Sequence, residues 1–360
     1  MGDLSKLKLE CLAIGSLPHN NLEDAMNVVE KYFNIPFWPQ LTKISKNEDM
    51  IVQFLESMPS FFIDKENGKV FLNTEYDEFF EDLEQFFMDY EEITADINSP
   101  AIDKYSISKD YSSSIPKFLE IIKNKKPAYA KGQIVGPFTL ATTLVDKDGR
   151  CAIYDETLKE IIIKTLTLKA LWQIKEIKKA CPDTIPLIFI DEPSISQLGT
   201  SAYVTVSQEE VIEMFKETAE AIQNAGALCA IHCCGKCDWC VPIESGINII
   251  NLDAYSFARN LSVFKDDVET FLKRGGKIAW GIVPTLDKEA LEKADEKILE
   301  EKFISAVKYL TEKGIDEKLV IDNSIITPSC GAGSLSEPLA EKAMSLTKKL
   351  SDSLKERYKV

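Results

Sequence analysis

Histidine and cysteine, the residues best able to bind a metal, are concentrated in one short segment. Five of the nine cysteines lie between Cys229 and Cys240, together with His232, one of only two histidines. His232 and Cys234 are two residues apart, so on a β-strand both side chains point the same way, whereas Cys233 points to the opposite side. An imidazole and a thiolate on one strand end are ligands that suit Zn²⁺. The pair therefore predicts part of a metal site.

Two further candidate ligands follow other apolar runs of the sequence. Asp253 comes directly after the run 247–252, and Cys330 follows the last run. In a barrel of parallel strands, polar groups just after the strands meet at one face. One imidazole, two thiolates and a carboxylate or an open position suit tetrahedral Zn²⁺. The alternative is a group of buried, reduced cysteines with a hydrogen-bonded core histidine.

The cysteine spacing also allows a different metal. Cys234-x-x-Cys237-x-x-Cys240 has the spacing that begins a bacterial iron–sulfur run, but no cysteine follows three residues later before a proline. Cys330 would have to supply the fourth ligand. Cys234 and Cys237 also have the redox C-x-x-C form, without a thioredoxin-like pattern around it. We predict that Asp238 caps a short helix beginning at residue 239, and that Cys237 and Cys240 are structural.

Short apolar, β-branched runs alternate along the chain with stretches of helical period. Such nearly continuous apolar runs are typical of strands buried on both faces. The predicted strands are residues 9–14, 35–38, 128–135, 187–190, 227–231, 247–252, 277–280 and 319–321. The helical stretches include residues 158–179, 208–225, 288–313 and 337–358. Eight strands alternating with helices predict an α/β fold, a closed (β/α)8 TIM barrel, with an open doubly wound sheet as the alternative.

The chain is predicted to form a single domain, residues 1–360, with an insertion at about 55–115 between the second and third strands. Two apolar runs flank Glu66-Asn67-Gly68, which predicts a β-hairpin. Aromatic and leucine residues then recur at helical spacing, at Phe79, Phe80, Leu83, Phe86, Phe87 and Tyr90. This stripe indicates the buried face of an amphipathic helix. The alternative is a lid over the barrel mouth or a partner-docking element.

Composition excludes several classes of function. The chain has 42 Lys and Arg against 58 Asp and Glu, a net charge of −16, which would repel a nucleic-acid backbone. No run of eighteen apolar residues is present, so we expect no membrane span. The first residues lack the apolar region of a secretory signal, so we expect a cytoplasmic protein.

Several motifs taken together resemble a known family. Ile14-Gly15-Ser16, Gly136-Pro137-Phe138-Thr139, Asp191-Glu192-Pro193, His232-x-Cys234 and Cys330-Gly331 occur in this order. They resemble the catalytic half of cobalamin-independent methionine synthase. That half belongs to a superfamily with uroporphyrinogen decarboxylase and the zinc-dependent methylcobamide:coenzyme M methyltransferases. The resemblance extends from about Leu9 to Cys330 and the closing helix. In size the chain is similar to short core forms, several of which take methyl groups from a corrinoid protein.

The resemblance implies a TIM barrel and a zinc site. His232, Cys234 and Cys330 match the zinc ligands of the family. Asp253 falls near the place where the methionine synthases have a ligating Glu, which is one methylene longer. The resemblance therefore leaves the fourth ligand open between Asp253, water and another group.

The resemblance also implies a substrate site. Ile14 and Ser16 match positions that contact the homocysteine carboxylate, and Asp191 matches an acid that holds its amino group. A second amino-binding Glu of the family has no clear match in residues 40–44, so a thiol other than homocysteine is open. His19, after the first strand, is a candidate catalytic residue for proton handling or carboxylate binding. The alternative is a solvated loop histidine.

These features predict a methyltransferase that binds a thiol as a zinc thiolate and methylates it from a methyl-corrinoid or a methyl-folate. A uroporphyrinogen decarboxylase-like enzyme is one alternative, but the Arg-rich segment of that branch is missing and its reaction uses no metal. The other alternative is a non-catalytic zinc or iron–sulfur protein that docks a corrinoid protein.

Overall fold

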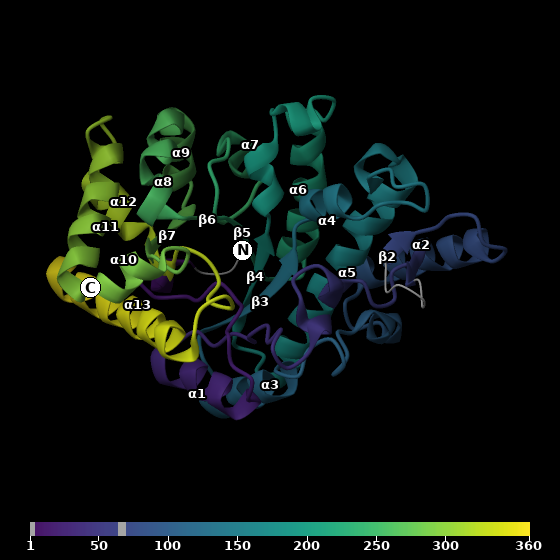
Figure 1. Ribbon diagram of the computed structural model, residues 1–360, viewed down its shortest axis with the longest axis horizontal. Helices are drawn as coiled ribbons and strands as arrows, with labels where there is room; N and C mark the ends of the chain where they lie inside the picture. The colour runs from purple at the N-terminus through teal and green to yellow at the C-terminus, as the bar shows by residue number, and fades with distance from the viewer. Residues whose placement is uncertain (1–3, 64–69) are drawn as a thin grey trace.

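The computed structural model describes residues 4–63 and 70–360. Figure 1 shows strands β3 to β7 near the centre with helices around them, and β2 towards the right edge beside α2. The strands are β1 Phe61–Ile63, β2 Val70–Leu72, β3 Tyr129–Val135, β4 Ile185–Asp191, β5 Leu228–Cys233, β6 Ile249–Leu252, β7 Lys277–Val283 and β8 Ser324–Pro328. The helices are α1 Leu22–Tyr32, α2 Phe79–Ala95, α3 Ile115–Lys125, α4 Pro137–Thr143, α5 Glu156–Ala180, α6 Gln208–Asn224, α7 Cys240–Glu244, α8 Ala254–Leu261, α9 Lys265–Lys273, α10 Lys288–Lys293, α11 Glu296–Thr311, α12 Glu317–Asp322 and α13 Glu337–Tyr358.

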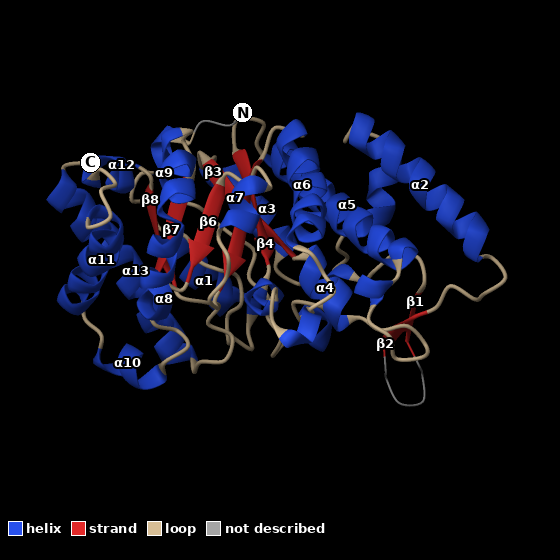
Figure 2. Cartoon of the chain, turned by 90° about the horizontal axis from the view of Figure 1, so that it is seen from above, coloured by secondary structure: helices blue, strands red, loops and turns tan. Residues whose placement is uncertain are grey.

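A curled sheet of six parallel strands organises the molecule, in the order β3-β4-β5-β6-β7-β8. Figure 2 shows these strands enclosed by helices. The register aligns Asp191 with Val135 on one side and with His232 on the other. Parallel alignment therefore brings the carboxyl ends of β4 and β5 to the same edge of the sheet.

The first two predicted strands are not formed as strands. Their segments make isolated parallel bridges instead, between Cys11 and Ile326, between Ser16 and Gln40, and between Phe37 and Lys131. The first segment thus lies beside β8 and the second lies beside β3, so each segment extends one edge of the sheet. The mixed α/β class is confirmed, whereas the predicted closed barrel of eight strands is replaced by a curled parallel sheet of six.

Alternate strand residues pack into two separate hydrophobic clusters. In β4, Ile188 and Ile190 join the large cluster that contains the helices, whereas Leu187 and Phe189 join a smaller one. Leu12 and Ile35, from the two N-terminal segments, belong to the smaller cluster. These segments therefore help to fill the inside of the curled sheet, although they lack regular strand pairing.

The predicted eighth strand was wrong. Residues 319–321 lie in α12, because the Asp316 side chain accepts a hydrogen bond from Leu319 N at 2.8 Å and starts a helix there. The true strand, β8, follows at Ser324–Pro328. The helix predicted at 288–313 is divided into α10 and α11, because Asp295 caps a new helix by accepting from Ile298 N at 2.8 Å.

The predicted insertion contains the expected elements. β1 pairs antiparallel with β2, and the Asn67-Gly68 turn lies outside the described residues. The aromatic stripe forms α2, which buries Phe79 and Phe86 and packs against α5. In Figure 2 this helix runs along the outer edge of the molecule. Packing against the body of the protein therefore accounts for most of the stripe, but the prediction that Phe80 is buried was wrong, because its side chain is 79% exposed.

Within the described residues, we find no helix with the length and apolar character needed to cross a membrane.

Candidate metal centre

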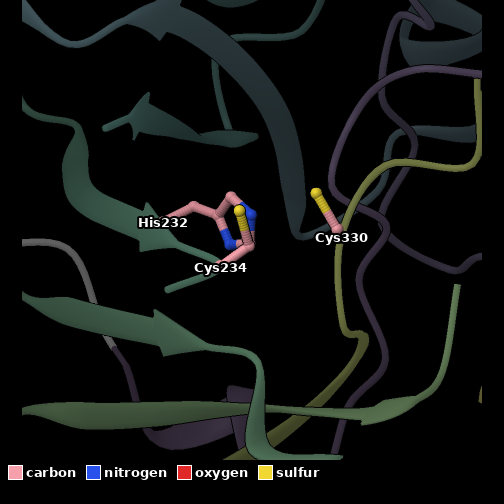
Figure 3. A group of neighbouring side chains, drawn as sticks. All are labelled: His232, Cys234 and Cys330. Carbon is pink, nitrogen blue, oxygen red and sulfur yellow. The ribbon is translucent and has the colours of Figure 1, made fainter. Parts of the chain in front are cut away.

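The three predicted ligands His232, Cys234 and Cys330 lie together. His232 is the penultimate residue of β5, Cys234 follows the strand, and Cys330 lies in the turn after β8. Their ligand atoms are all within 4.8 Å of one another. Figure 3 shows His232 and Cys234 leaving the same strand side by side, with Cys330 facing them from another segment. The strand alternation predicted from sequence therefore brings two ligands to one point.

A hydrogen bond to Asn251 fixes the orientation of the His232 ring. Nδ1 of His232 is 2.7 Å from Oδ1 of Asn251, on β6. Asn251 Nδ2 donates to the carbonyl oxygen of Ala279 at 2.7 Å and to Thr327 Oγ1 at 2.9 Å. Because the amide nitrogen is oriented by these acceptors, Oδ1 must accept from Nδ1–H, which leaves a lone pair on Nε2. His232 Nε2 is buried without a hydrogen-bond partner.

The pKa values of the two thiols are shifted in opposite directions. The hydrogen bond with Cys330 lowers the pKa of Cys234 to about 4. The hydrogen bond with Cys234, together with burial, raises the pKa of Cys330 far above its usual range. One thiolate is therefore ready at neutral pH, and the second proton would leave when a cation replaces it.

This donor set fits zinc. An imidazole with a free Nε2 lone pair and two cysteine sulfurs are the nitrogen and sulfur ligands that Zn²⁺ takes in proteins. Three protein ligands leave one tetrahedral position for a substrate, as in catalytic rather than structural zinc sites.

Asp253 lies near the three ligands but has a different contact. It follows β6, is 1% exposed, and its Oδ1 accepts from Ser256 N at 3.0 Å as the cap of α8. The group whose atoms could hold one ion, searched over the described residues, is His232, Cys234 and Cys330. Ligation by Asp253 therefore stays a prediction.

The cluster lies in the wall of a cavity of about 510 Å³. The predicted substrate residues Ile14, Ser16 and Asp191 line the same cavity. Pro193 and Gly331, which belong to the sequence motifs, also line it. The lining residues that sequence analysis did not single out are Gln40, Thr42, Glu48, Asp49, Met50, Leu286, Gly333 and Ser334. His19 is not a lining residue. It is 5% exposed, its Nδ1 has no partner, and burial lowers its pKa against the opposing charges of Glu337 and Asp24.

Asp191 and Glu192 point to different environments, as neighbours at a strand end do. Asp191 is 5% exposed, lines the cavity, and its Oδ1 has no hydrogen-bond partner. Burial raises its pKa, whereas the charge of Lys131 lowers it. An unpartnered carboxylate oxygen in a cavity wall is suited to binding a cationic group.

Glu192 instead forms hydrogen bonds with the start of α4. Its carboxylate accepts hydrogen bonds from Phe138 N, at 3.1 Å, and from Thr139 Oγ1. A β-carbon at Gly136 would overlap this carboxylate, which explains the glycine before Pro137. Burial raises the pKa of Glu192 to about 8. The motif at residues 136–139 therefore holds its shape through Glu192.

A fully buried lysine contacts the segment of Ile14, which lines the cavity. Lys131, on β3, donates from Nζ to the carbonyl oxygen of Ile14 at 2.5 Å and to Gln133 Oε1 at 2.8 Å. Burial lowers the pKa of Lys131 to about 8, against the opposing charge of Asp191. The lysine thus ties the Ile14 segment to β3 and acts electrostatically on Asp191.

The cavity wall carries acids, and no Lys or Arg occurs among its described lining residues. Both carboxylate oxygens of Glu48 are occupied, because they accept from the backbone N–H groups of Leu41 and Ser113 at 2.9 Å. Asp49 is exposed, which leaves Asp191 as the buried acid free to bind. This electrostatic environment favours a cationic ligand over a polycarboxylate.

The remaining clustered cysteines have other contacts. Cys233 Sγ lies 3.6 Å from the carbonyl oxygen of Gly235. Asp238 accepts from the Cys240 backbone N–H at 3.0 Å just before α7, and Cys240 Sγ donates to Asp267 at 3.3 Å. Among the described residues, Cys234, Cys237 and Cys240 do not form a metal-holding group. These contacts agree with the structural interpretation rather than the iron–sulfur one.

No family model and no curated protein matches the chain. Among solved structures, the chain is similar to a B12-independent methionine synthase from Shewanella sp. W3-18-1 in complex with selenomethionine. The TM-score is 0.43 and the identity is 16%, over 67% of each chain. An overlap this loose does not establish a shared family or activity.

Proposed function

We propose that this chain is a zinc-dependent methyltransferase that methylates the sulfur of a thiol. The observation that carries the proposal is the group His232, Cys234 and Cys330, whose ligand atoms lie within 4.8 Å of one another in the wall of a cavity. The order of the sequence motifs supports the same conclusion. The donor would be a methyl-corrinoid, presented by a corrinoid protein, or a methyl-folate.

Zinc bound by these ligands would deprotonate a thiol substrate and hold it as a zinc thiolate, ready to attack a methyl group. The chain's own residues have three other tasks. Asn251 holds the His232 ring so that Nε2 faces the site. Asp191 would bind the ammonium group of the substrate, and the cavity walls would exclude water around the sulfur.

The acidic cavity favours a thiol that carries an amine. Asp191 has a free, buried oxygen, and no basic residue among the described lining residues would bind an anionic group. The same electrostatics disfavour the decarboxylase alternative, because a porphyrinogen with many carboxylates would lack cationic partners.

Metal content and methyl transfer test the proposal together. Anaerobically purified wild-type protein should contain about one zinc per chain, because the three ligands form a single zinc site. The C330S variant should lose most of this zinc, and the control C151S, at a cysteine outside the cluster, should keep it. Equal zinc in wild type and C330S would refute the ligand assignment. Iron with sulfide would favour the iron–sulfur alternative.

The donor is identified by supplying methylcobalamin or methyltetrahydrofolate separately, with homocysteine or cysteamine as acceptor. Zinc-loaded wild type should form the methyl thioether with one donor class, and C330S should not. A zinc-loaded chain that is inactive with both donors would favour the non-catalytic zinc protein.

A further inference from the structure

Ser16 lies in close contact with the turn that carries Cys330. The backbone oxygen of Ser16 accepts from Ala332 N at 2.9 Å, and its Oγ accepts from Gly333 N at 3.2 Å. A β-carbon at Gly331 would overlap Ser16 Oγ but lie 3.4 Å from Ser16 Cβ. The turn therefore needs glycine at 331 because Ser16 is so near.

The glycines of this turn are required by proximity and not by backbone conformation. Gly331 and Gly333 are not among the glycines with positive φ. At Gly333, a β-carbon would lie 3.0 Å from both Cβ and Oγ of Ser16. Contacts this short force a neighbour to move. Ser16 thus leaves no room for a side chain at Gly331 or at Gly333.

A second residue holds the other side of the turn. Thr285, in the loop after β7, accepts from Cys330 N at 3.0 Å and donates from Oγ1 to the carbonyl oxygen of Cys330 at 2.9 Å. His232 lies on β5 and Cys234 directly follows it, whereas Cys330 is positioned by these loop contacts. A ligand on a turn depends on its supporting contacts for its position.

We propose that Ser16 is a positioning residue for Cys330, so that the segment after Ile14 sets the place of the third metal ligand. This role is distinct from the substrate contact that the sequence predicts for Ser16. It rests on the metal centre proposed above. It makes zinc affinity depend on the fit between the Ser16 side chain and the glycine at 331.

A double-mutant cycle between Ser16 and Gly331 tests this role. Zinc affinity is measured by competition with a chromophoric chelator, and Co²⁺ loading reports thiolate coordination through its charge-transfer absorption. S16A removes the contact to Gly333 N and should weaken zinc binding about 10-fold. G331A adds the overlap and should weaken it about 100-fold.

The combination gives the decisive result. Because the added β-carbon overlaps Oγ and not Cβ, the double variant G331A/S16A should recover to the zinc affinity of S16A alone. In the matched pair, S16A should not rescue G333A, because Ser16 Cβ is as close to that position as Oγ is. Thermal unfolding of the metal-free variants should be unchanged between S16A and wild type.

Two outcomes overturn the role of Ser16 while leaving the metal centre intact. One is wild-type zinc affinity in S16A, and the other is a double variant no better than G331A. If G331A does not fold, recovery of the folded state in the double variant is the expected result, and failure to recover counts against the proposal. A wild-type chain that binds no zinc refutes the proposed function itself.

Discussion

Asn251 determines which nitrogen of His232 carries the proton. The 2.7 Å hydrogen bond between them occupies Nδ1, and the two acceptors of Asn251 Nδ2 prevent the amide from turning over. The ring is therefore presented with Nε2 free. This relationship joins β5 to β6 and reaches β7 through Ala279 and β8 through Thr327, so four strands take part in positioning one side chain.

Replacing Asn251 by alanine should weaken zinc binding about 10-fold, because the ring loses the partner that sets its tautomer. Chelator competition measures the change. N248A is the matched control, since Asn248 also links the β5 and β6 segments, accepting from Cys229 N at 2.9 Å, but at the opposite end. It should lower stability without changing zinc affinity. Equal losses in both variants would contradict the tautomer argument.

Replacing Asp191 by asparagine should raise the KM for an amine-bearing thiol such as cysteamine by about 10-fold or more, because the charged partner of the ammonium is lost. The KM for 2-mercaptoethanol, which has no amine, should not change. Zinc content should stay at the wild-type level. D49N, at an exposed acid of the same cavity, is the control and should have little effect. An equal rise in KM for both thiols would mean that Asp191 does not bind the amine.

Replacing Lys131 by methionine should lower kcat/KM about 10-fold with zinc content unchanged, because the Ile14 carbonyl and Asp191 lose their cation. Removing the cation alone leaves Asp191 buried without its partner, so K131M should also unfold more easily, and the kinetics are measured at a temperature where the variant is folded. The control is K169M, since Lys169 is equally buried, with its Nζ on the carbonyl oxygen of Ser106 at 2.9 Å. Steady-state kinetics should show a loss only in K131M.

Replacing Glu192 by glutamine should change how stability depends on pH. Burial raises the pKa of Glu192 from an ordinary value of 4.5 to about 8, so between these values the folded chain keeps a proton that the unfolded chain releases. The wild type therefore loses stability as pH rises through this window. Glutamine does not titrate. The free energy of unfolding of E192Q, relative to that of wild type, should therefore rise by at least about 1 kcal/mol as the pH is raised from 5 to 8.

Urea unfolding of the metal-free proteins at several pH values measures this difference. Metal must be removed because the cysteine ligands also exchange protons. Parallel pH curves for wild type and E192Q would show that Glu192 is not protonated in the folded chain.

The grouping of His232, Cys234 and Cys330 could be predicted from sequence because their geometry is local. Period-two alternation places His232 and Cys234 on one side of a strand, whatever the rest of the fold does. Cys330 required only the rule that strand ends converge. Asn251 was missed because its role depends on partners from two other strands. The signal available was a polar residue inside an otherwise apolar run, and Asn251 shares that property with Asn248 in the run 247–252.

The errors in the fold have similar physical reasons. Residues 319–321 are apolar over a length that suits a strand or a helical turn, and only the cap at Asp316 decides between them. The two N-terminal segments have the right apolar pattern, yet their backbones make isolated bridges rather than ladders. Sequence pattern reports which side chains are buried, but not how completely the backbone pairs.

An ion shared by β5 and the turn after β8 would join parts of the sheet that are three places apart in strand order. Such an ion would cross-link the curled sheet, because it would hold the turn after the last strand against the end of a strand in the middle of the sheet. Occupancy then raises the free energy of unfolding, by about 2.7 kcal/mol at a free zinc concentration 100 times the Kd. The lifetime of the folded chain would thereby follow zinc supply, and zinc starvation would shorten it even where no substrate is present.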